Sequence, residues 1–169
     1  MFNAPFIDYL ILSPFLGLLM LAALYDVADY RIPNVISIAL AALYPLFVLF
    51  GTVQPAWGTA LIIAAAVFAA GLGLFAAGLM GGGDVKLMTV VALWAGPVHI
   101  VGFLMVTALA GGLLALIIIS PLRSLLAHTV ASMGGSAINQ TLSGAVLPYG
   151  VAIAAGGAYV GVMLISGAG

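Results

Sequence analysis

The chain has 169 residues, and its charged side chains are three Lys or Arg and four Asp. Hydrophobic residues make up 66% of the sequence, against about half in a soluble domain, and charged residues make up 4%, against roughly a quarter. This composition excludes a soluble globular enzyme and a disordered chain, and the absence of Cys excludes a disulfide-stabilised scaffold. The chain is therefore predicted to be a polytopic protein of the lipid bilayer.

Six apolar stretches follow one another along the chain, and a helical membrane span needs about 20 such residues. The stretches are 9–27, 35–51, 57–79, 85–97, 98–120 and 147–167. The fourth is short, and Gly96-Pro97 divides it from the fifth, so five or six spans are compatible with the sequence and six are favoured. Six spans of about 20 residues leave no room for a soluble domain. Residues 1–169 are therefore predicted to form one all-α integral-membrane domain.

The basic residues set the orientation, because Lys and Arg accumulate on the cytoplasmic side of membrane proteins. In a six-span topology Arg31, Lys86 and Arg123 all fall on the same side, which is therefore predicted to be cytoplasmic. Both termini then face outward. The first thirty residues contain no Lys, so a cleaved signal with a basic start is not expected.

The few polar groups also limit the cofactors and partners. The net charge is −1 and no basic stretch is present, so nucleic-acid binding is excluded. With no Cys, no Glu and two His far apart in sequence, neither a metal site nor another cofactor is predicted. His99 and His128 are expected at the protein surface or at a membrane interface, and Trp57 and Trp94 are expected at the membrane interfaces.

Two carboxylates are predicted to meet at the cytoplasmic face. Asp26 ends the first span and Asp84 opens the fourth, so the topology places both at one depth on one side. Charged residues at the membrane boundary suggest function by default. Two adjacent carboxyl groups can share a proton, so that one takes a proton from water while the other polarises a peptide carbonyl. Asp29 could share this helix face, but pairing with Arg31 or simple hydration is the favoured interpretation.

Other residues near the two Asp are candidates for shaping the site. Without Cβ atoms, Gly81-Gly82-Gly83 allow unusual backbone dihedrals and the close approach of a substrate backbone. Lys86 could orient the site or lower the pKa of a carboxyl group, or it could anchor the helix at the lipid headgroups. Pro33 is expected to end the turn after the first span, and Asn34 to cap the next helix.

Together these segments resemble a known family. Residues 81–84, Gly-Gly-Gly-Asp, match the GxGD motif of intramembrane aspartic proteases, and residues 85–87 fit the prepilin peptidase branch of that group. Asp26 with the Ile-Pro-Asn turn at 32–34 is similar to the first catalytic segment of this branch. The Leu-Pro-Tyr-Gly sequence at 147–150 is similar to an element near the C-terminus of the family.

The resemblance implies an inner-membrane aspartic endopeptidase that removes the short leader of type IV prepilins at the cytoplasmic membrane boundary. Asp26 and Asp84 would be catalytic, and the supporting residues would be Gly81, Gly82, Gly83, Lys86, Pro33 and Asn34. The short chain without Cys resembles the Flp-type, or tight-adherence, form that lacks the methyltransferase-associated region. Archaeal preflagellin peptidases are a second close branch. The implied partners are prepilin-like membrane substrates and, as a further candidate, the pilus-assembly machinery.

Two functions of other classes stay open at this point. Membrane carboxylates also build proton relays, so a small proton-coupled transporter or channel component is an alternative. Against it, the Asp residues gather at one face instead of crossing the membrane. The other alternative is an inactive pilus-assembly scaffold that keeps the fold, which the intact pair of Asp residues disfavours.

Overall fold

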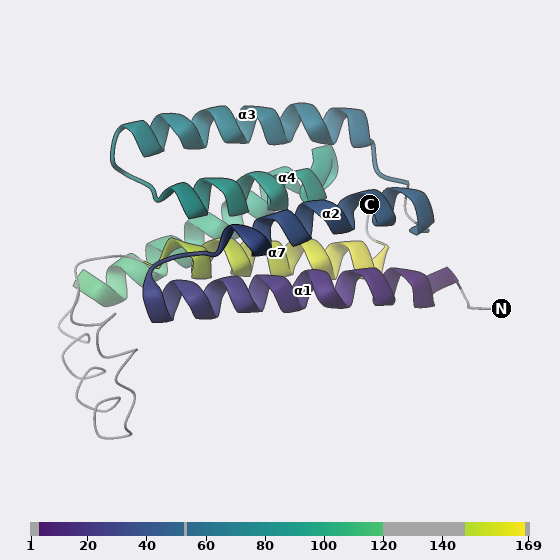
Figure 1. Cartoon of the computed structure of the whole chain (residues 1–169), viewed down its shortest axis with the longest axis horizontal. Helices are drawn as coiled ribbons and strands as arrows, with labels where there is room; N and C mark the ends of the chain where they lie inside the picture. Colours follow the sequence, from purple (N-terminus) through teal and green to yellow (C-terminus); the bar gives the residue numbers. More distant parts are fainter. Residues whose placement is uncertain (1–3, 53, 120–147, 168–169) are drawn as a thin grey trace, which may run out of the picture.

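The structure is a computed structural model that describes residues 4–52, 54–119 and 148–167. Within these ranges the chain is helical and contains no strand. The helices are α1 (Ala4–Asp29), α2 (Asn34–Phe50), α3 (Trp57–Ala76), α4 (Gly82–Ile119) and α7 (Tyr149–Ser166). They lie alongside one another in an elongated bundle (Figure 1). The predicted all-α membrane fold is confirmed. The connection at 121–146, with Arg123 and His128, lies outside the described residues.

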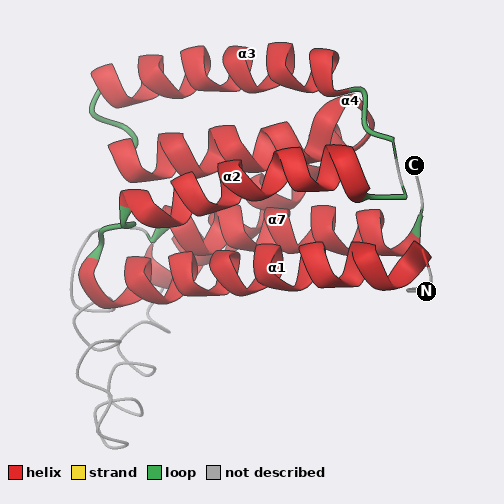
Figure 2. Ribbon diagram, turned by 45° about the vertical axis from the view of Figure 1, so that its right-hand side comes forward, coloured by secondary structure: helices red, strands yellow, loops and turns green. Residues whose placement is uncertain are grey.

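The helix α4 occupies the centre of the bundle. It packs against α3 on one side and against α7 and α2 on the other, while α1 packs against α7 and α2. Both views show α3 at one edge and α1 at the opposite edge (Figures 1 and 2). The two edge helices, α1 and α3, are therefore separated by the helices that pack between them.

The lengths of the helices suit a bilayer. Helices α1, α3, α4 and α7 contain stretches that are long and apolar enough to cross a membrane. The 17 residues of α2 are also apolar, and at a rise of about 1.5 Å per residue they extend about 26 Å, close to the ~30 Å hydrocarbon core. Backbone groups in lipid must be satisfied internally, which is why such apolar stretches form helices. The chain is a multi-pass membrane protein.

The chain reverses its direction inside α4. Gly96 has φ 54° and ψ −165°, a non-helical conformation that glycine adopts without steric cost. Pro97 has no N–H to donate and fits the first turn of a new helical segment. The residues before Gly96 run away from the start of α4, and those after it return toward that end (Figure 1). The break predicted at Gly96-Pro97 is therefore confirmed, with the fourth and fifth apolar stretches as the two arms of α4.

Trp94 lies in the core, so the prediction that it sits at a membrane interface is wrong. Its side chain is only 2% exposed, and its indole Nε1–H donates a hydrogen bond to the Leu40 carbonyl oxygen at 3.0 Å. Three aromatic rings lie 4.5, 5.5 and 5.3 Å from it between centroids, those of Phe15, Tyr44 and Phe47 respectively. Trp94 thus joins α1, α2 and α4, since a large ring whose N–H has a partner can be buried. Trp57, in contrast, is exposed.

The end of the bundle remote from the two predicted catalytic residues has its own polar contact. Asp8 of α1 is buried and accepts hydrogen bonds from the Thr52 backbone N–H, at 2.9 Å, and from the Thr52 hydroxyl. These bonds tie the start of α1 to the residues after α2. His99, just after the reversal in α4, is also buried, with 7% exposure, so the prediction that it lies at the surface or at a membrane interface is wrong.

Candidate active site

Asp26 and Asp84 lie at the same end of the bundle. Asp26 is in the last turn of α1 and Asp84 is in the first turn of α4, and these two helix ends lie on the same side (Figure 1). Both residues line one cavity of about 290 Å³, together with the turn after α1 and the glycine run before α4. Asp26 is 5% exposed and Asp84 is half-buried. The two carboxyl groups are close enough to interact electrostatically.

The start of α7 holds the carboxyl group of Asp26. The Gly150 backbone N–H donates a hydrogen bond of 2.6 Å to Asp26 Oδ2. N–H groups in the first turn of a helix have no partner within the helix, and the helix dipole there favours a negative charge. A Cβ atom at Gly150 would lie 2.8 Å from the same oxygen, so only glycine permits this approach. The sequence resemblance includes the Pro148-Tyr149-Gly150 element, but it does not predict that the Gly150 N–H bonds to Asp26.

The glycines before Asp84 permit close packing around the second carboxylate. A Cβ at Gly81 would lie 2.8 Å from Asp84 Oδ2, and one at Gly83 would lie 3.3 Å from Ile32 Cβ. The left-handed residue of this connection is Gly78, with φ 72°, which precedes the run. The run thus acts here by leaving space for Asp84 and for the turn after α1, and not through positive φ angles.

The turn after α1 is held in a strained conformation. Tyr30 has φ 51°, which is uncommon for a residue with a side chain, and its N–H bonds to the Asp26 carbonyl oxygen at 3.1 Å. Its hydroxyl is buried and has no hydrogen-bond partner in the part of the chain that the structure describes. Ile32 is also buried, and it contacts the positions where Gly83 and Gly150 would carry side chains. The turn after α1 therefore packs between the start of α4 and the start of α7.

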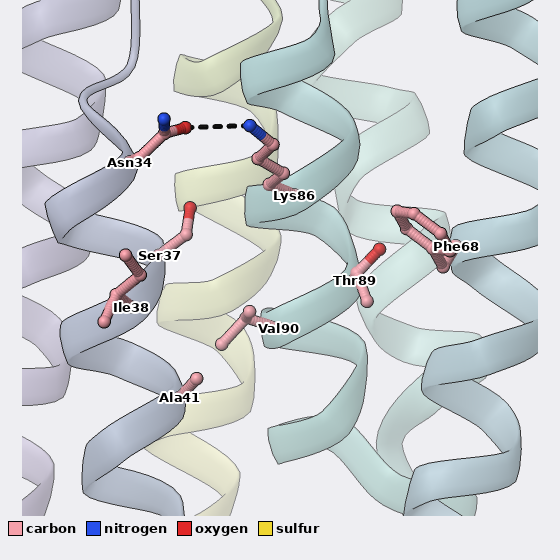
Figure 3. Close-up of a pocket in the computed structure, with 8 residues that line it drawn as sticks. All are labelled: Asn34, Ser37, Ile38, Ala41, Phe68, Lys86, Thr89 and Val90. Atoms are coloured by element: carbon pink, nitrogen blue, oxygen red, sulfur yellow. Dashed lines mark hydrogen bonds between the residues drawn. The ribbon is translucent and has the colours of Figure 1, made fainter.

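Asn34 and Lys86 form a polar contact beside the cavity. The Lys86 Nζ atom donates a hydrogen bond of 2.9 Å to Asn34 Oδ1, which links the start of α2 to α4 (Figure 3). Asn34 is the first residue of α2 and Pro33 occupies the N-cap position, where no side chain caps the helix. The predicted capping role of Asn34 is therefore wrong, because its side-chain oxygen accepts from Lys86.

The chain matches a known protein family. The family model of type IV leader peptidases matches residues 14–116, well over half of the chain. The chain belongs to the type IV leader peptidase family. The matched range includes Asp26, the turn after α1, the glycine run and Asp84, whereas Gly150 lies beyond it. No curated protein and no solved structure matches the chain. The protein is thus a membrane-embedded peptidase, and its family implies prepilin substrates.

In this leader peptidase Asp29 lies apart from the other two carboxylates. It is exposed at the end of α1 and lines a second cavity, of about 640 Å³, with Tyr25 and Arg31. That cavity contains neither Asp26 nor Asp84. Arg31 lines both cavities, so it lies between Asp29 and the site. The structure therefore groups Asp26 with Asp84 and leaves Asp29 at the surface.

The residue types in the site of the peptidase are those of acid–base chemistry. Among the described residues, no group of three or more His, Cys, Asp or Glu could hold a metal ion. The ionisable side chains that line the cavity are Asp26, Asp84, Tyr30 and Arg31. Two carboxyl groups that interact can divide the tasks of general base and general acid between them.

Proposed function

We propose that this leader peptidase is an aspartic endopeptidase of prepilins, with Asp26 and Asp84 as its catalytic pair. The observation that carries the proposal is that the two carboxyl groups, distant in sequence, line one cavity and interact electrostatically. Their surroundings differ, since Asp26 accepts the Gly150 N–H while Asp84 lies at the start of α4 beside Gly81. Unequal surroundings make one carboxyl group easier to ionise than the other. Such a pair is suited to carry one proton, with one group ionised and the other protonated.

Catalysis would proceed by direct attack of water on the scissile peptide. The ionised carboxylate takes a proton from the water, and the oxygen of the water bonds to the carbonyl carbon. At the same time the protonated carboxyl group donates its proton to the carbonyl oxygen. The tetrahedral intermediate then collapses. The C–N bond breaks as the leaving nitrogen takes the proton of one carboxyl group, while a hydroxyl group of the intermediate gives its proton to the other carboxylate and becomes the carbonyl of the product. The proton count of the pair is restored with no acyl-enzyme, so no nucleophilic side chain is required.

The surroundings of the site support cleavage at the cytoplasmic boundary of the inner membrane. Arg31 lines the catalytic cavity, and Lys86 follows Asp84 by less than one helical turn. Lys and Arg mark the cytoplasmic side, so the cavity would face the cytoplasm and the start of α1 and the end of α7 would face outward. The side chains of Asp26, Asp29 and Asp84 balance those of Arg31, Lys86 and Arg123 in charge. Bulk electrostatics would therefore contribute little to the capture of a basic leader.

We further propose that residues 1–169 act as one domain and that the substrates are Flp-type prepilins. This proposal rests on the resemblance of the sequence, in which no Cys occurs, to the Flp-type form. The pilus-assembly machinery would then act on the product of this cleavage.

The test is co-expression with a Flp-type prepilin from the same genome, read by gel shift and by the N-terminal mass of the product. Asp26→Ala, Asp26→Asn, Asp84→Ala and Asp84→Asn should each lower processing by at least about 100-fold, because Asn keeps the shape but cannot exchange the proton. Asp29→Ala is the matched control and should retain processing. Equal processing by all the variants, at equal amounts in the membrane, would refute the catalytic pair.

A further inference from the structure

An apolar groove lies on the outer surface of the bundle, next to the catalytic cavity, with which it shares Asn34. It has a volume of about 400 Å³ and lies between α2 and the first arm of α4, with α3 at its far edge. The side chains that form it are Ser37, Ile38, Ala41, Thr89, Val90 and Phe68 (Figure 3). We refer to it as the α2/α4 groove.

Helix packing explains why the α2/α4 groove is open. Helices α2 and α3 both pack on α4, but they make few contacts with each other, so a strip of α4 between them stays uncovered. Ser37, Ala41 and Thr89 are small and leave space at the bottom of the groove. Ile38 and Phe68 form its sides and are 65% and 44% exposed. Small residues of this kind let a membrane helix approach closely.

The α2/α4 groove leads to the carboxylate pair. Asn34 lines the groove, the catalytic cavity and the polar cavity that contains Asp29. The hydrogen bond between Lys86 and Asn34 lies at one end of the groove (Figure 3), and Lys86 follows Asp84 by two residues in α4. Along this path the surface changes from apolar side chains to the two carboxylates and then to polar groups.

We propose that the α2/α4 groove binds the hydrophobic helix of the prepilin substrate, which enters sideways from the bilayer. This inference rests on the proposed function, since it assigns a binding site to that substrate. A prepilin has a polar leader, then the scissile bond, then an apolar helix, and this order matches the polar cavity, the carboxylates and the groove. The volume of the groove suits the side chains along one ridge of the substrate helix. Asn34 would then lie beside the first residues after the cut.

Two neighbouring alanines of α2 provide a matched test. Ala41 lines the groove, whereas Ala42 is exposed and does not line it. Each is changed to Phe, and the purified enzyme in liposomes is assayed with a full-length prepilin. Ala41→Phe should raise KM about tenfold with kcat nearly unchanged, because it fills the space for the substrate helix. Ala42→Phe should leave both constants within about twofold of wild type. Equal KM values for the two variants would overturn the proposal.

A second pair of variants identifies the occupant directly. A photoreactive amino acid replaces Ala41 or Ala42 in the Asp84→Ala enzyme, which should bind prepilin without cutting it. The proposal expects an adduct with prepilin from position 41 and none from position 42. Adducts with lipid alone from position 41 would show that the groove is a lipid site and would overturn it. If Ala41→Phe does not fold, Phe68→Ala, which removes one side of the groove, should raise KM instead.

The two proposals fail in different ways. If wild type cuts prepilin and Asp84→Ala does not, the catalytic pair stands whatever the result at Ala41. If Ala41→Phe then cuts with an unchanged KM, only the groove assignment is lost. If Asp84→Ala cuts as well as wild type, the catalytic pair itself is refuted.

Discussion

Replacement of Gly150 by Ala tests whether the start of α7 positions the catalytic carboxylate. The new methyl group would lie 2.8 Å from Asp26 Oδ2 and from Ile32 Cδ1, and 2.9 Å from Asp26 Cβ. Ordinary van der Waals contact begins at 3.4 Å, so these atoms must separate by about 0.6 Å, the difference between 3.4 and 2.8. Ile32 packs against Gly83, and Asp26 Cβ is attached to the backbone of α1. Neither group can therefore move away from the new methyl group without shifting its neighbours.

The expected loss of activity follows from this displacement. The bond from the Gly150 N–H to Asp26 involves a carboxylate, and such bonds contribute about 1.5–3 kcal/mol. A shift of about 1 Å in a reacting group can cost about 100-fold in rate. We therefore expect kcat of Gly150→Ala to fall between about 10- and 100-fold, with a loss of stability of about 1–3 kcal/mol from overpacking.

The assay is cleavage of a prepilin by enzyme in liposomes, with thermal unfolding measured in the same preparation. Gly17→Ala in α1 is the control, because no atom lies within 4 Å of the position of its new Cβ. In the middle of a helix this change should stabilise the protein by up to about 1 kcal/mol, and kcat should not change. A Gly150→Ala enzyme with the kcat of wild type would refute the idea that Gly150 positions Asp26.

Two further substitutions test how single buried polar groups affect the stability of the fold. Tyr30→Phe removes a buried hydroxyl without a partner in the described structure, so the free energy of unfolding should stay the same or rise by about 1 kcal/mol in thermal denaturation. A lower stability would mean that the hydroxyl makes a favourable interaction. Thr52→Val removes the hydroxyl that bonds to Asp8 and should lower stability by about 1–3 kcal/mol. Because this contact lies at the end of the bundle remote from Asp84, kcat for prepilin should not change; a large fall in kcat would contradict the separation of the two ends.

The sequence alone was sufficient to predict the membrane class, the helices and the meeting of two carboxylates. Long apolar stretches must become helices in lipid, and their alternation across the membrane brings Asp26 and Asp84 to one end. The break at Gly96-Pro97 was also predictable, because its residue types suit a reversal of the chain.

Only the tertiary structure decided which faces and neighbours these helices use. In a soluble helix the apolar stripe marks the buried face, but here both faces are apolar, so the buried side depends on the size and shape of side chains. Trp94 therefore lies in the core and not at an interface, and Gly150, remote in sequence, holds Asp26. The bond between Lys86 and Asn34 likewise depends on the distance between α2 and α4. Hydropathy determines that a segment spans the membrane, whereas close packing determines which of its residues meet.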